Sequence, residues 1–320
     1  MIDENHRELL AQVASMYYDQ ELTQSAIGEE LGLSRVKIYR LLKQAKEEQI
    51  VQITIHWPLE RELTFERALL DRFDLDEALV LKTSSENRST VLRRLGQLGA
   101  RYLEQILKDG MTMAVCVGRS TYEVIHAIRP GFRAGINVAQ AMGSVPFAVQ
   151  EFDSVALARE LAQKLGGQVL YLSSPLMADS PEAALVLRSQ RSIERTLSAA
   201  RDADVALLGI GNLDPVISGF VKAGSIVPEE LVQLARDGAI GDIGGQVFRL
   251  DGTLHHSDYN QRIIGLTLKE MRRIPMTVAA ASGQEKAEAI LGALRTGVID
   301  VLCIDDQAAE AVLRLDPNHK

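Results

Sequence analysis

Short apolar runs alternate with amphipathic helical patterns from residue 110 onwards, and this alternation leaves the chain few possible folds. Apolar strands separated by such helices predict a parallel sheet with helices on both faces. The expected strands are 111–117, 135–141, 168–172, 204–210, 275–281 and 299–304. The expected helices are 120–129, 153–165, 181–200, 228–237, 283–296 and 306–314. Ligands of such sheets bind beyond the carboxyl ends of the strands, so a site is expected at the strand exits.

The first sixty residues have a different pattern. Residues 7–20 carry a helical apolar stripe, and two shorter helices follow, separated by Gly32. Ser34 suits the N-cap of the second short helix. Two short helices joined by a glycine-containing turn predict an all-α helix-turn-helix domain. Residues 50–55 alternate like a strand and predict the edge of a wing.

The helix that follows Ser34 has a basic face. Between Leu33 and Lys46 there are five basic residues and no acidic one, on a chain of net charge −8. In a recognition helix the N-terminal residues meet base edges, and flanking cations meet phosphates. We expect base contacts from Arg35, Val36, Tyr39 and Arg40, and phosphate contacts from Gln24, Ser34, Lys37 and Lys43. The alternative is a small helical domain with a solvated basic face.

We place a domain boundary near Trp57-Pro58. Residues 1–57 form the expected helix-turn-helix DNA-binding domain, and residues 58–320 form one α/β domain for effector binding and oligomerisation. The larger domain opens with a charged amphipathic helix over 59–73, a short strand over 77–83 and a long helix over 86–108.

Composition excludes several classes of protein. The net charge of −8 argues against a uniformly basic surface for nucleic acid, although a local basic patch remains compatible with it. Cys116 and Cys303 both lie in apolar runs, so we expect buried thiols and neither a disulfide framework nor a zinc site. No signal peptide is expected at the polar N-terminus, and no apolar run approaches the ~20 residues of a membrane helix. A cytoplasmic protein without membrane contact is expected.

Polar residues follow several of the predicted strands. After the first strand, Gly118 precedes Arg119, Ser120 and Thr121, and a helix start with two hydroxyls and a cation is a plausible anion cradle. Further exits carry Gly143-Ser144, Gly209 with Gly211, and Gly283 to Lys286. A glycine at a strand exit is more often only a tight turn.

Lys286 and Asp242 are the most informative charged residues of these segments. Lys286 falls in the first turn of the expected helix, where the helix dipole favours anions. An anionic ligand that shares this helix start would offset that unfavourable interaction. Asp242 lies between glycines in an expected loop, which suits contacts with sugar hydroxyls. The alternatives are a solvated lysine and an aspartate that caps a helix. Together these residues predict a small phosphorylated ligand rich in hydroxyls.

The chain resembles the SorC family, also called SorC/DeoR-type, of sugar-responsive bacterial transcription regulators. The resemblance rests on five stretches: YYDQELTQSAIGEELGLSRVKIYRLLKQAKEEQIVQITI, AVCVGRSTYEVI, ADVALLGIG, GAIGDIGGQVF and ASGQEKAEAILGALRTGVIDVLCIDDQAAEAVL. It implies a winged helix-turn-helix domain and a Rossmann-like effector domain similar to sugar-phosphate isomerases, without catalysis or a cofactor. It also implies operator DNA as a partner, a phosphorylated sugar effector and a homo-oligomer, a dimer or a tetramer.

The resemblance also places the effector residues by motif position. They are Gly118, Arg119, Ser120, Thr121, Ser144, Asp242, Gly283 and Lys286, with Met177 at a position where some members carry an arginine. Lys286 would pair with the phosphate, and Asp242 would accept hydroxyls. Ser282 stands where a second glycine is usual, and the first exit reads Cys-Val-Gly where Gly-aromatic-Gly is frequent.

Two alternative functions remain open at this point. An isomerase or deaminase with a DNA-binding appendage would need a general base near the sugar carbon. His126, His255 and His256 lie outside the exit motifs, and "HHSD" has the pattern of a surface turn, so no catalysis is expected. A regulator that binds an unphosphorylated sugar or polyol is the second alternative, and Met177 in place of a cation favours it.

Overall fold

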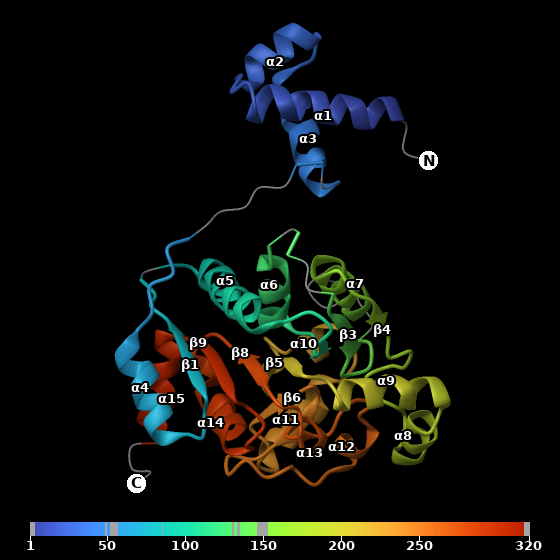
Figure 1. The fold of residues 1–320 in the computed structure, drawn as a ribbon, viewed down its shortest axis with the longest axis vertical. Helices are drawn as coiled ribbons and strands as arrows, with labels where there is room; N and C mark the ends of the chain where they lie inside the picture. The colour runs from blue at the N-terminus through green and yellow to red at the C-terminus, as the bar shows by residue number, and fades with distance from the viewer. Residues whose placement is uncertain are drawn as a thin grey trace. The chain divides into compact units, whose positions relative to one another are not determined.

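The computed structural model describes residues 4–48, 50–51, 57–84, 86–129, 131–132, 135–145 and 153–316. It divides into two compact units, one ending at Pro58 and the other beginning at Leu59. Figure 1 shows the ribbon of each unit. None of the described helices is long and apolar enough to cross a membrane.

Three helices make up the N-terminal unit: α1 (Glu4–Tyr18), α2 (Gln24–Leu31) and α3 (Arg35–Glu47). Capping side chains set where α2 and α3 begin. The Thr23 hydroxyl accepts a hydrogen bond from the Ala26 amide at 3.2 Å, and the Ser34 hydroxyl accepts one from the Lys37 amide at 3.2 Å. The short turn between α2 and α3 contains Gly32, as the sequence predicts.

A small apolar core holds these helices together. Its fully buried members are Leu10 and Val13 of α1, Ile27 of α2, and Ile38, Leu41 and Ala45 of α3. Each helix therefore buries one stripe and leaves its other face exposed. The predicted wing over 50–55 falls mostly on residues 52–56, which lie outside the described residues.

A parallel sheet forms the centre of the larger unit. Seven strands among the described residues run parallel in the order β1-β9-β8-β5-β2-β3-β4. Strands buried on both faces read as continuous apolar runs, which is why they are visible in the sequence. Their bounds are β1 (Glu77–Leu81), β2 (Thr112–Val115), β3 (Asn137–Gln140), β4 (Val169–Leu170), β5 (Val205–Asn212), β8 (Thr277–Ala280) and β9 (Val301–Asp305).

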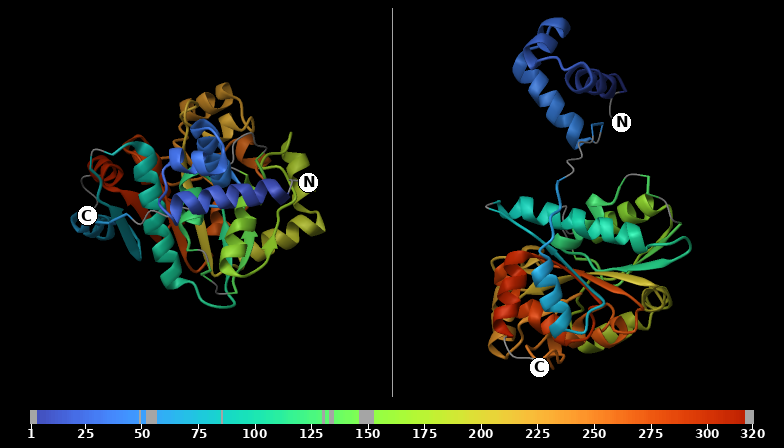
Figure 2. Two further views of the ribbon diagram at one scale, coloured as in Figure 1. Left: turned by 90° about the horizontal axis from the view of Figure 1, so that it is seen from above. Right: turned by 60° about the vertical axis from the view of Figure 1, so that its left-hand side comes forward.

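Helices cover both faces of this sheet (Figures 1 and 2). One face carries α5 (Arg88–Ile106), α6 (Arg119–Ala127) and α7 (Ser154–Leu165). The opposite face carries α4 (Leu63–Arg72), α9 (Arg191–Arg201), α14 (Ala287–Arg295) and α15 (Asp306–Leu315). The prediction of an α/β domain with a parallel sheet is therefore confirmed.

Several details differ from the expected pattern. The helix expected over 181–200 is two helices, α8 (Pro181–Arg188) and α9, separated at Ser189-Gln190. The helix expected over 283–296 starts as a 3₁₀ turn, η2 (Gln284–Lys286), before α14. The sequence also gave no expectation of three short helices. These are α10 (Gly219–Lys222), α12 (Asp258–Arg262) and α13 (Leu268–Met271), whereas α11 (Pro228–Arg236) was expected.

An antiparallel hairpin replaces the expected glycine-rich loop around Asp242. It consists of β6 (Gly241–Ile243) and β7 (Gln246–Phe248), joined by a tight turn at Gly244-Gly245. The hairpin pairs with residues 210–212, where β5 extends beyond its parallel neighbours. The prediction that Asp242 lies in a loop is wrong because each strand is only three residues long, too short to leave a readable alternation between glycines.

Candidate functional site

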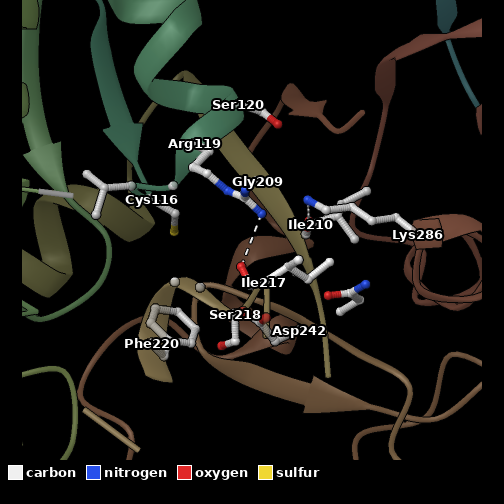
Figure 3. Close-up of a pocket in the computed structure, with 16 residues that line it drawn as sticks. Cys116, Arg119, Ser120, Gly209, Ile210, Ile217, Ser218, Phe220, Asp242 and Lys286 are labelled. Atoms are coloured by element: carbon white, nitrogen blue, oxygen red, sulfur yellow. Dashed lines mark hydrogen bonds between the residues drawn. The ribbon is translucent and has the colours of Figure 1, made fainter. Parts of the chain in front are cut away.

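A pocket opens at the carboxyl ends of β2 and β5, where ligands of parallel sheets bind. It encloses about 610 Å³ of empty space, part of which is open to solvent. Figure 3 shows how its side chains converge from separate parts of the chain. Its walls are formed by residues 116–120, 209–212, 217–220, Asp242, Gly244 and Lys286.

The start of α6 forms one wall of the pocket. Gly118 is the N-cap residue of α6, and Ser120 in the first turn is buried. The Thr121 hydroxyl donates to the Gly118 carbonyl at 3.0 Å and stabilises the first turn of α6. The Arg119 guanidinium points into the pocket and donates from Nη2 to the Ile217 carbonyl at 3.1 Å (Figure 3). A helix start with a cation beside it is suited to an anion.

The loop after β8 brings Lys286 to the pocket. Gly283 has a φ of 101°, a conformation that favours glycine, and its amide donates to an Asp305 carboxylate oxygen at 2.8 Å. Lys286 is buried, and its Nζ donates to the Ile210 carbonyl at 2.6 Å. Burial, and after it the nearby Arg119 charge, lower the pKa of Lys286 to about 8, against the opposing effect of Asp242.

Asp242 faces the pocket from the hairpin. Its carboxylate is buried and accepts a hydrogen bond from the Gly245 amide at 3.1 Å. Burial raises the pKa of Asp242 to about 6, against the opposing effects of that hydrogen bond and of Lys286. At neutral pH Asp242 is therefore mostly ionised and Lys286 mostly protonated. With Arg119, the three side chains leave one unit of positive charge in the pocket.

The N-terminal unit presents a second candidate surface on α3. Val36 is 61% exposed and Tyr39 is 57% exposed, and neither side chain packs in the core of that unit. The basic side chains Arg35, Lys37, Arg40 and Lys43 are also exposed. Lys43 forms an exposed ion pair with Glu47 at 3.6 Å. This basic surface with two apolar side chains is what α3 offers to a partner.

Comparisons with known proteins place the chain in a family. A family model described as "Putative sugar-binding domain" matches residues 58–314. The transcriptional regulator LsrR of Klebsiella pneumoniae is 32% identical over 96% of this chain and 93% of its own length. The chain belongs to the SorC/DeoR-type family of sugar-responsive transcriptional regulators.

Two further similarities span both units of this SorC-type regulator. The deoxyribonucleoside regulator of Bacillus subtilis is 28% identical over 98% of this chain and 99% of its own length. The full-length sorbitol operon regulator SorC of Klebsiella pneumoniae has a TM-score of 0.70 at 26% identity, over 97% of this chain and all of that one. These relatives are regulators and not enzymes, in agreement with the expectation that this chain has no catalytic role.

The structure gathers some of the predicted effector residues and separates others. Gly118, Arg119, Ser120, Asp242 and Lys286 line the pocket of this SorC-type regulator. Thr121 and Gly283 support its walls without lining it, through the hydrogen bonds described above.

Ser144 and Met177 lie outside the pocket lining. The Ser144 amide donates to the Ser174 carbonyl at 2.8 Å, beside a bridge to Pro175. Met177 lines a second hollow, together with Glu230 and Arg262. Met177 is therefore not a neighbour of Arg119 in that lining, and its apolar character says little about the charge of the pocket.

Several pocket residues had no place among the predicted effector residues. Cys116 and Asn212 line the pocket from the ends of β2 and β5, and Ile217 to Phe220 close it from the start of α10 and the two residues before it. For the β5 residues, the sequence offered one indication: Gly209 and Gly211 mark a strand exit. No local pattern marks Ile217 to Phe220, because they reach the pocket only through tertiary packing.

His126, His255 and His256 do not line the pocket, and the expected surface turn needs one correction. His256 is exposed, but His255 is buried, so the expected surface turn at "HHSD" is only half right. The His255 amide donates to the Val247 carbonyl at 3.0 Å, and the Asn260 side-chain amide donates to the His255 carbonyl at 2.7 Å. His126 lies at the far end of α6 and contacts Glu160 at 3.2 Å. No cluster of potential metal ligands occurs among the described residues.

Proposed function

We propose that the pocket binds a phosphorylated sugar, and that this effector controls the affinity of the first three helices for operator DNA. The observation that carries the proposal is the charge arrangement of the pocket. Arg119 and Lys286 converge on the pocket from α6 and from the loop after β8, and Asp242 lies on the hairpin side of it (Figure 3).

The two kinds of charge suit the two ends of a sugar phosphate. A phosphate beside the start of α6 would meet backbone amides, the Ser120 hydroxyl and the Arg119 guanidinium. It would also compensate the desolvated ammonium of Lys286, which a neutral ligand cannot do. Sugar hydroxyls would donate to the Asp242 carboxylate, and Asn212 can donate or accept beside it.

The α3 surface is the proposed DNA interface, as a helix-turn-helix recognition helix. Arg35, Val36, Tyr39 and Arg40 are the proposed base-reading residues, because they are exposed on the first turns of α3. Phosphate contacts are proposed for Gln24, Ser34, Lys37 and Lys43. Ser34 already uses its hydroxyl oxygen as an acceptor for the helix cap, and its hydroxyl hydrogen is the group it would donate.

Regulation requires the effector to bind one state of the protein better than another. A coupling of about 1–3 kcal/mol would change operator affinity about 5- to 150-fold. A homo-oligomer, a dimer or a tetramer, would place two α3 helices on the half-sites of an operator.

A thermal-shift screen tests the effector proposal. Free sugars and polyols are compared with their phosphates on the wild type and on two lysine variants. Lys286→Ala should lose the response to phosphates, by about 10- to 100-fold in affinity, because a buried charged donor is removed. Lys269→Ala, at an exposed lysine of α13, is the matched control and should respond like the wild type. A response to free sugars that Lys286→Ala retains would favour an unphosphorylated effector and contradict the proposal.

A further inference from the structure

The segment from Asp214 to Ser225, which carries α10, has few hydrogen bonds to the rest of its unit. Its own hydrogen bonds are local: the Ser218 amide donates to the Asp214 carbonyl at 2.9 Å, and the Ser225 amide donates to the Phe220 carbonyl at 2.9 Å. Between described residues, the hydrogen bond that joins this segment to another element is the one from Arg119 to the Ile217 carbonyl.

The same segment separates two empty spaces. Ile217 to Phe220 line the pocket, and Gly224 to Val227 line the second hollow, which encloses about 460 Å³ including open solvent. The hollow gives the segment space into which it can move when it leaves the pocket. Phe220 is half-buried against the core, whereas Val216 is 77% exposed.

Ser225 gives independent evidence that the position of this segment in the structure has an energetic cost. Its hydroxyl oxygen is buried beside the second hollow and has no hydrogen-bond partner among the described residues. A buried hydroxyl without a partner is costly, so a rearrangement that exposes it is partly compensated. Segments whose hydrogen bonds are mostly local, with few to the rest of the domain, open at low free-energy cost.

We propose that Asp214–Ser225 is a lid over the pocket, and that Arg119 is the positioning residue that holds it closed. A guanidinium has several N–H donors, so Arg119 can hold the Ile217 carbonyl and an anion at the same time. An anion in the pocket keeps the guanidinium in place and so favours the closed lid. The inference concerns the pocket of the proposed function, but its test uses protein without effector.

Trypsin cleavage after Lys222 reports on the lid, because Lys222 is exposed at the end of α10 and can fit a protease only when the segment opens. Full-length protein is digested under native conditions, and mass spectrometry follows this cleavage against all others. Arg119→Ala should be cleaved after Lys222 about ten-fold faster than the wild type, because one charge-assisted hydrogen bond is lost. Arg119→Lys keeps a cationic donor and should restore part of the protection.

Arg129→Ala is the matched control, because Arg129 lies just beyond α6 and pairs with Glu104 at 2.7 Å instead of with the lid. It should leave cleavage after Lys222 unchanged. The proposal is overturned if Arg119→Ala is cleaved there no faster than the wild type. It is also overturned if the acceleration is equal at all sites and follows a lower melting temperature, since Arg119 would then be a general structural residue. Neither result depends on whether a sugar phosphate binds.

Discussion

Gly211 and Asp242 share one space across the pairing of β5 with β6. A Cβ atom at Gly211 would lie 1.9 Å from the Asp242 Oδ1 atom, so the carboxylate occupies the volume that any other side chain at 211 would need. The two residues are directly opposed in the register. The buried carboxylate is also held by the Gly245 amide and has little freedom to move away. Glycine at 211 therefore positions the proposed hydroxyl acceptor.

Gly211→Ala is expected to displace the Asp242 carboxylate. Overpacking of this kind costs about 1–3 kcal/mol of folding free energy, and effector affinity should fall with it. Denaturant unfolding and effector titration measure the two effects. Gly209→Ala is the matched control for the unfolding measurement, because its Cβ would make only an ordinary contact, 3.7 Å from the Thr121 Cγ2 atom. If the clash is the cause, the double variant Gly211→Ala/Asp242→Ala will lose less stability than the sum of the single variants.

Effector affinity is expected to depend on pH through Lys286. Burial lowers the pKa of Lys286 to about 8, so the ammonium is present below that pH and is lost as the pH rises through it. Phosphate monoesters are already dianions above their second pKa of about 6, so the ligand's charge stays constant. Binding measured from pH 7 to 9.5 should weaken and approach about ten-fold per pH unit above 8. Lys286→Met should bind weakly with no such slope. A wild-type affinity that stays level across this range would contradict the role of Lys286.

The parallel sheet and the start of α3 were predictable from the sequence for physical reasons. Strands such as β5 and β8 are buried over most of their length, and residues 205–208 and 278–280 are therefore continuous apolar runs. Ser34 marked the start of α3, because a capping hydroxyl acts on an amide only three residues away. The break between α8 and α9 was missed because Ser189-Gln190 carries neither glycine nor proline.

Apart from Asp242, the pocket residues that the sequence predicted lie in the segments that follow β2 and β8. Arg119 and Lys286 are such residues, and both line the pocket. Ile217 and Phe220 lie in the segment that follows β5, but no local sequence pattern marks them as pocket residues. Ser144 also follows its strand, yet it pairs with the neighbouring segment at Pro175 and does not line the pocket. A strand exit therefore indicates where a site lies, whereas the tertiary pairing decides which residues enter it.

Arg40→Ala is expected to abolish retention of operator DNA and to leave the effector-induced thermal shift intact, because Arg40 is exposed on α3 in the smaller unit. Loss of a base contact costs about 1–3 kcal/mol of discrimination, and loss of a phosphate contact lowers the salt dependence of binding. Electrophoretic mobility shifts at several salt concentrations distinguish the two. Arg7→Ala, on an exposed position of α1, is the control and should bind like the wild type. Normal operator binding by Arg40→Ala would mean that the interface is assigned to the wrong face.

The contact between α5 and α6 should tolerate little added volume. A Cβ at Gly96 would lie 2.5 Å from the Glu123 carbonyl carbon and oxygen, so the two helix backbones touch at this point. Gly96→Ala must push α6 away from α5, at a cost of about 1–3 kcal/mol, and lower the melting temperature by several degrees. Because α6 starts at Arg119, the shift should also weaken effector binding. Ala100→Gly, a buried position of the same helix, removes volume instead of adding it and should lower stability without the matching loss of effector affinity. Equal losses of affinity in both variants would show that general destabilisation, and not the displacement of α6, is responsible.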